Sequence, residues 1–149
     1  MQRTSIKKSV QINAEPEEIW QVLTEDRFNR AWYTDFSEGS YAETDWKEGS
    51  KVLFKDTSGR GMFSKVVESK PNEIISMEHQ GVLMDNKEVF DSEEAASWKG
   101  CRETYRISQQ EGHCLFSVEQ DIPGEYRDAF LSMWDKALNK IQELAERGL

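Results

Sequence analysis

One of the two histidines in this sequence lies in a pattern that could support acid–base chemistry inside an apolar environment. Ile75, Met77 and His79 alternate with polar residues, which predicts a strand that carries all three on its inward face. Imidazole titrates near neutral pH and serves as a general acid or base. His79 is therefore a catalytic candidate. The plainer alternative is a core or rim histidine whose nitrogens are satisfied, and His113, next to a turn, is expected to be exposed.

A hairpin near the end of the sequence adds a carboxylate to this inward set. The Glu111-Gly112 turn predicts a two-residue loop, which pairs Gln110 with His113 and Glu103 with Gln120. The face that carries Glu103 is otherwise mostly apolar, with Tyr105, Ile107, Phe116 and Val118. Glu103 is the second catalytic candidate, because an enzyme could use it with His79 or Tyr105. No spacing ties a nucleophile to this pair, so no catalytic triad is predicted.

The cysteines and histidines are too few and too scattered for a metal site. There are two of each and no CxxC motif. In the hairpin register Cys101 and Cys114 do not face each other, so we expect two free thiols rather than a disulfide. We expect no metal and no cofactor.

The elements that must position these residues follow from hydrophobic periodicity. A strand is expected from Ser5 to Ile12, followed by two short helices, the first starting near Pro16. Six strands should then fill the chain from Gly39 to Ile122, and one long amphipathic helix the stretch from Glu125 to Glu146. The six strands are expected at Gly39–Asp45, Lys51–Lys55, Met62–Glu68, Ile74–Val82, Trp98–Ser108 and Cys114–Ile122. The polar residues 85–97 are interpreted as a mobile loop or an added turn.

Composition excludes several classes of protein. The chain has 149 residues and a formal net charge of −9, without a basic cluster that could neutralise phosphates, so no nucleic-acid partner is expected. No apolar run is long enough to span a membrane, and the first residues do not form a signal peptide. We therefore expect one domain over residues 1–149, located in the cytoplasm, as a monomer or a homodimer.

The order and spacing of the elements resemble a known superfamily, the helix-grip fold of START and birch-pollen-allergen-like proteins (SRPBCC). Within it, the chain is most similar to the family named after the activator of the ninety-kilodalton heat-shock protein ATPase (AHSA-type). The matching stretches are Ile12–Thr24 (INAEPEEIWQVLT), Ala31–Thr34 (AWYT), Asp45–Ser50 (DWKEGS), Gly61–Ile75 and Met133-Trp134. The resemblance implies an α+β fold in which a curved antiparallel sheet of about seven strands wraps around a long C-terminal helix.

The resemblance also bears on function. The superfamily is associated with small apolar ligands, such as lipids and steroids, held between sheet and helix. The eukaryotic activator has a separate N-terminal domain associated with chaperone docking, for which this chain has no room, so a chaperone partner is not expected.

Aromatic and methionine side chains from every expected element could line such a cavity. The predicted ligand-binding residues are Trp20, Phe28, Trp32, Phe54, Met77, His79, Trp98, Tyr105, Phe116, Phe130, Met133 and Trp134. Its entrance is expected near Phe28–Phe36 and residues 85–97. The alternative is a filled interior without a usable pocket.

The leading functional prediction is a module that binds a small hydrophobic or amphipathic molecule and is not an enzyme. The first alternative is a cyclase- or hydrolase-type enzyme that acts in the same cavity. The second is an interaction protein related to chaperone ATPase activation, which would need an exposed apolar patch instead of an internal cavity.

Overall fold

A computed structural model describes residues 2–34, 36 and 38–148 of the chain. The first strand, β1 (Arg3–Ile12), leads into two short helices, α1 (Pro16–Thr24) and α2 (Asp26–Tyr33). The strands β2 (Tyr41–Glu43), β3 (Lys51–Lys55), β4 (Gly61–Lys70), β5 (Ile74–Met84) and β6 (Lys87–Val89) follow. After the short helix α3 (Glu93–Trp98) come β7 (Arg102–Gln110), β8 (His113–Pro123), a single 3₁₀ turn and the long helix α4 (Arg127–Arg147).

The strands form one antiparallel sheet in the order β1-β8-β7-β5-β4-β3-β2. The short strand β6 is not part of this order and pairs with β5. The hairpin of β7 and β8 has the predicted register, with Glu103 opposite Gln120 and Gln110 opposite His113. Because side chains alternate between the two faces of a strand, this register places the buried side chains of both strands on one side of the sheet.

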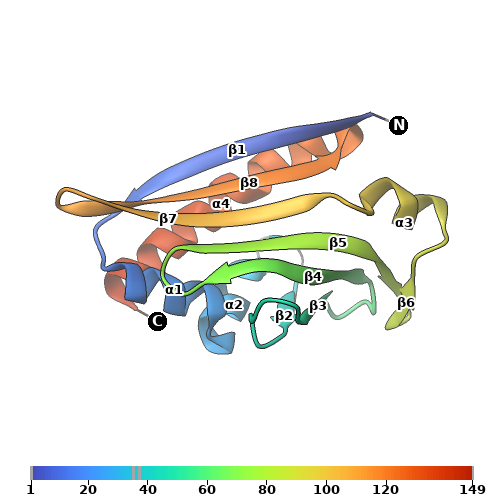
Figure 1. The fold of residues 1–149 in the computed structure, drawn as a ribbon, viewed down its shortest axis with the longest axis horizontal. Helices are drawn as coiled ribbons and strands as arrows, with labels where there is room; N and C mark the ends of the chain where they lie inside the picture. Colours follow the sequence, from blue (N-terminus) through green and yellow to red (C-terminus); the bar gives the residue numbers. More distant parts are fainter. Residues whose placement is uncertain (1, 35, 37, 149) are drawn as a thin grey trace.

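The sheet curls around α4, which lies along its concave face (Figure 1). The apolar stripe of α4 is buried against the sheet, as its periodicity predicted. Its buried residues are Trp134, Ala137, Leu138, Ile141, Leu144 and Ala145. Helices α1 and α2 pack on α4 near one end of the sheet and close that end. The predicted helix-grip architecture is thereby confirmed.

The segment 85–97, interpreted from the sequence as a loop or added turn, has regular structure. Asp85 and Asn86 both have positive φ angles, 51° and 62°, and form the two-residue turn that pairs Met84 with Lys87. This is the backbone conformation that tight hairpins require. Ser92 then caps α3 by accepting a hydrogen bond from the backbone N–H of Ala95. Trp98 therefore ends a helix and does not begin a strand as predicted.

A buried polar chain and a divided cavity

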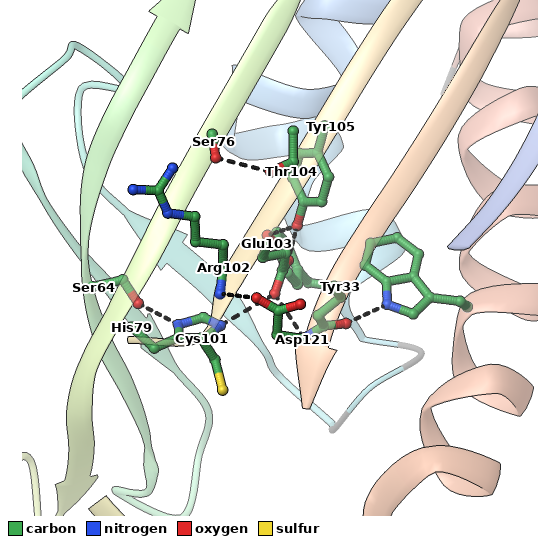
Figure 2. Close-up of polar contacts among 12 residues, drawn as sticks. Tyr33, Ser64, Ser76, His79, Cys101, Arg102, Glu103, Thr104, Tyr105 and Asp121 are labelled. Carbon is green, nitrogen blue, oxygen red and sulfur yellow. Dashed lines mark hydrogen bonds and ion pairs between the residues drawn. The ribbon is translucent and has the colours of Figure 1, made fainter. Parts of the chain in front are cut away.

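A buried carboxylate lies between β7 and α4 and collects hydrogen bonds from both sides. Glu103 is only 6% exposed. One of its carboxylate oxygens accepts a hydrogen bond from the Tyr105 hydroxyl, and the other accepts one from Gln120 Nε2 at 2.9 Å. The chain continues outward in both directions, because Tyr33 and Tyr105 hydroxyls are 2.9 Å apart and Trp134 Nε1 donates to Gln120 Oε1 at 2.8 Å. Helices α2 and α4 are thus joined through the sheet by buried hydrogen bonds (Figure 2).

His79 lies beside this carboxylate, and one of its ring nitrogens has no hydrogen-bond partner among the described residues. It is 1% exposed, and its Nδ1 is 2.6 Å from the Ser64 hydroxyl. Its Nε2 is 3.6 Å from Glu103 Oε1, too far for a hydrogen bond, and has no hydrogen-bond partner among the described residues. A register shift between Phe63 and Ser64 in β4 places Ser64 directly across from His79. Such a bulge re-aims the side chains that follow it, and periodicity within one strand does not predict it.

The charge of Glu103 also acts on the two tyrosines. Burial raises the pKa of both the Tyr33 and the Tyr105 hydroxyl well above the usual value, and the nearby Glu103 carboxylate raises each further. Both hydroxyls therefore stay protonated at any physiological pH and act as donors. Since Tyr105 donates to Glu103, its oxygen is left to accept from Tyr33.

A cavity of about 190 Å³ opens at the end of this polar chain, between the sheet, α4 and the segment after α2. Five of the predicted binding residues line it: Phe54, His79, Phe130, Met133 and Trp134. Glu103 lines it as well, so both catalytic candidates face the same space. Tyr33, Ser40 and Arg60 also line it and were not among the predicted binding residues.

Most of the other predicted binding residues belong to the packed interior. Trp32, Met77, Tyr105 and Phe116 are at most 1% exposed and do not line the cavity. Tyr105 reaches it indirectly, through its hydrogen bonds to Tyr33 and Glu103. Their inward orientation was predicted correctly, but an inward side chain faces a cavity only where its neighbours leave a gap.

The remaining three predicted residues lie elsewhere. Trp20 is half-buried and borders a shallow hollow next to Trp46, away from the polar chain. Phe28 is buried, with the Arg27 guanidinium 4.6 Å from its ring centre. Trp98 lines a second cavity of about 240 Å³, with Glu94 as the residue of segment 85–97 at its edge. The lining of the first cavity includes Tyr33 and Phe36 from the predicted entrance region Phe28–Phe36, and no residue of segment 85–97.

Other functional groups give no further centre in the part of the chain that the structure describes. Cys101 and Cys114 are buried and free, in line with the hairpin register. His113 is half-buried at the start of β8, not exposed as predicted. Within residues 2–34, 36 and 38–148, no three His, Cys, Asp or Glu side chains lie together as a metal site requires. No helix in these ranges is long and apolar enough to cross a membrane.

An antiparallel sheet that grips a long C-terminal helix, with two short helices after the first strand, defines a helix-grip protein. The sequence agrees with this class: residues 13–146 match the model of the family described as activator of Hsp90 ATPase homolog 1-like protein. The chain belongs to this family.

Solved structures of similar fold extend over nearly the whole chain. The Aha1 dimer from Colwellia psychrerythraea is 21% identical, with a TM-score of 0.71, covering 97% of this chain and 98% of that one. Protein MLL2253 from Mesorhizobium loti is 16% identical, with a TM-score of 0.72, covering 95% and 96%. DynU16, from the dynemicin biosynthetic locus, is 12% identical, with a TM-score of 0.71, covering 97% of this chain and 48% of that one. No curated protein matches the sequence. At these identities the structures establish the fold and leave the ligand to be argued from the site.

Proposed function

We propose that this protein binds a small, neutral, amphipathic molecule in the cavity beside α4, with a hydroxyl group of the ligand directed at His79 and Glu103. The observation that carries this proposal is His79 Nε2, a buried polar atom without a hydrogen-bond partner among the described residues, in a residue that lines a cavity with both aromatic and polar walls. Leaving such an atom unpaired is unfavourable by about 1–3 kcal/mol, so a ligand that pairs with it gains affinity.

The donors and acceptors around the cavity favour a hydroxyl as the ligand's polar group. If the Ser64 hydroxyl donates to Nδ1 across their 2.6 Å contact, the neutral imidazole carries its proton on Nε2 and donates into the cavity. Glu103 can only accept, and a carboxylate has more acceptor sites than the two that Tyr105 and Gln120 occupy. A hydroxyl accepts from His79 and donates to Glu103. An anionic group in the same place, beside Glu103, would instead be repelled by the buried carboxylate. The basic residues of the lining are Lys55, which is paired with Glu43, and the exposed Arg60.

The size and walls of the cavity favour a compact ligand. A cavity of about 190 Å³ is close in size to engineered protein cavities of about 150 Å³ that hold benzene. Phe54, Phe130, Met133 and Trp134 supply apolar surface, and Met side chains adapt to irregular shapes. An interaction module would need an exposed apolar patch. Among the described residues, the large apolar side chains that are exposed are those of Met84 and Phe90, so the outer surface favours a ligand-binding protein.

Calorimetric titration of phenol, cyclohexanol and benzoate into the full chain tests this proposal. We expect both hydroxyl compounds to bind and benzoate to bind at least tenfold more weakly. His79→Phe should weaken phenol about tenfold, the equivalent of one lost hydrogen bond in a buried site. His113→Phe is the matched control, since it changes the other histidine outside the cavity. Equal affinity for benzoate, or an unchanged affinity in His79→Phe, would contradict the proposal.

Native mass spectrometry of protein purified without detergent would complement this titration. A discrete added mass, absent from the denatured protein, would report an occupied cavity and identify the class of its natural occupant. An added mass that carries a carboxylate or phosphate would count against a neutral ligand.

A second candidate function is proton transfer to or from the bound molecule, which the fixed orientation of His79 favours. This role uses the other tautomer of the neutral imidazole: Nδ1–H donates to the Ser64 hydroxyl, and the lone pair of Nε2, on the side of Glu103, is left to take a proton. The test uses cyclohexanone in D₂O: a general base removes an α-proton and returns a deuteron, which NMR detects. Exchange that is faster with the native protein than with His79→Phe would favour an enzyme. Equal rates would count against proton transfer and leave ligand binding as the proposed function.

A further inference from the structure

Two of the cavities in the part of the chain that the structure describes are neighbours and have residues in common. The first, of about 190 Å³, contains the polar groups, and the second, of about 240 Å³, lies toward α3. Arg60, Gly61, Met62 and Phe130 line both of them. The two spaces therefore meet at these four residues.

The four residues that line both cavities differ in size and burial. Met62 in β4 is half-buried and unbranched, and Phe130 in α4 is half-buried as well. Gly61 has no side chain and admits none, since a Cβ there would lie 1.8 Å from the Phe54 carbonyl oxygen. Met62 and Phe130 are therefore the shared residues with partly buried side chains, whereas Arg60 is exposed.

Trp98 forms a firmer boundary on the histidine side of the second cavity. Its ring stacks on Tyr126, with centroids 5.7 Å apart, and meets the edge of the His79 ring at 5.8 Å and 87°. His79 lines the first cavity and not the second. The second cavity adds apolar surface from its strand wall of Val82, Leu83 and Met84.

We propose that the two cavities form one divided ligand site, in which a hydroxyl-bearing ring occupies the first and an apolar chain passes between Met62 and Phe130 into the second. This inference rests on the function proposed above and specifies the ligand as a phenol or cyclic alcohol with an alkyl extension. Each cavity alone is smaller than the roughly 300–1,000 Å³ typical of ligand pockets, whereas the two joined fall within that range.

A series of 4-alkylphenols tests the proposal: phenol, 4-ethylphenol, 4-butylphenol and 4-hexylphenol, titrated calorimetrically into the full chain. Each methylene that enters the second cavity should tighten binding about fourfold, which is the transfer free energy of one buried CH₂ expressed as an affinity ratio. The gain should begin once the chain outgrows the first cavity. Affinity that levels off or falls beyond 4-ethylphenol would overturn the divided site.

Two substitutions at Val82 test whether the gain in affinity with chain length arises in the second cavity. Val82 lines only the second cavity and pairs with Met62 across the strands. Val82→Phe fills that space and should abolish the gain with chain length, while Val82→Ala enlarges it and should extend the gain to longer chains. Val67→Phe is the matched control, because Val67 is a half-buried residue of β4 that lines neither cavity.

The outcomes separate this proposal from the one on which it rests. Binding of phenol by Val82→Phe would show that the variant is folded and that the first cavity is intact. Phenol binding without a chain-length effect in the wild type would overturn the divided site and keep the proposed function. Failure of every member of the series to bind would overturn both. A chain-length effect that Val67→Phe abolishes as strongly as Val82→Phe would also overturn the placement in the second cavity.

Discussion

At the scale of residues, the protein concentrates its buried polarity around one carboxylate. Tyr105 and Gln120 donate to Glu103, and each is held in turn by a group from a helix, Tyr33 from α2 and Trp134 from α4. Buried polar groups are tolerated when such a chain satisfies all of them. The exception among the described residues is His79 Nε2, the atom on which the proposed ligand contact is based.

The raised pKa values of Tyr33 and Tyr105 predict how stability depends on alkaline pH. In the unfolded chain these hydroxyls ionise near the ordinary value of 10.0, whereas in the folded protein they ionise well above it. Below about pH 10 both states keep the protons and the tyrosines add no pH dependence. Above it only the unfolded chain loses them, so the free energy of unfolding should fall by up to about 1.4 kcal/mol per pH unit for each tyrosine.

Urea denaturation between about pH 9 and about pH 11 measures this slope. Tyr33→Phe should make the slope shallower by about the contribution of one tyrosine, and comparison with the wild type cancels the titration of the lysines. An identical slope in both proteins would show that the Tyr33 hydroxyl ionises alike in the folded and unfolded chains.

At the scale of elements, the cavity depends on irregularities in otherwise regular strands. The register shift after Phe63 brings Ser64 to His79, and the turn between β3 and β4 brings the backbone of Gly61 against Phe54. Gly61 borders both cavities, so the close approach of these two strands lies where the cavities meet.

Gly61→Ala should therefore destabilise the protein more than a glycine substitution in open space. A Cβ at Gly61 would lie 1.8 Å from the Phe54 carbonyl oxygen, which forces β3 and β4 apart. We expect a loss of about 2–3 kcal/mol in the free energy of unfolding, measured by urea denaturation.

Gly112→Ala provides the control for backbone strain alone. Gly112 has a φ of 80°, but a Cβ there would meet nothing within 4 Å. Its substitution should lower the free energy of unfolding by only about 1 kcal/mol. Equal losses in the two variants would show that strand contact at Gly61 contributes nothing beyond strain.

At the scale of the whole molecule, the sheet, α1, α2 and α4 bury one continuous apolar interior. The core includes residues from β1 through α4, and both cysteines are part of it. Chemical access to these thiols therefore reports on opening of the fold.

Cys101 and Cys114 should react slowly with a thiol reagent in the native protein and fast once it is unfolded. Burial raises the pKa of both thiols, and the thiolate is the reactive form. If labelling requires unfolding, a bound alkylphenol should slow it by the factor 1 + [L]/Kd. The single-cysteine variants Cys101→Ser and Cys114→Ser assign the rate to each site. Rapid labelling of the native protein, or no effect of ligand, would indicate local access instead.

The sequence alone determined what local periodicity and turn chemistry control. The Glu111-Gly112 turn set the register that joins Glu103 to Gln120, alternation in β5 directed His79 inward, and the stripe of apolar residues defined α4. The Asp85-Asn86 pair is likewise a local turn signal, and the structure has a turn there. The Ser92 cap is an equally local signal, which the polar composition of residues 85–97 obscured.

Only the tertiary structure decided which inward side chains meet and which leave space between them. Tyr33 and Tyr105 are 72 positions apart, and Ser64 reaches His79 through a bulge that no pattern within one strand encodes. Among the predicted aromatics, Trp32 and Phe116 fill the core while Phe54 and Trp134 face the cavity. Periodicity fixes the face on which a side chain lies, but a void arises from how side chains of distant segments fit together, and that fit exists only in the folded chain.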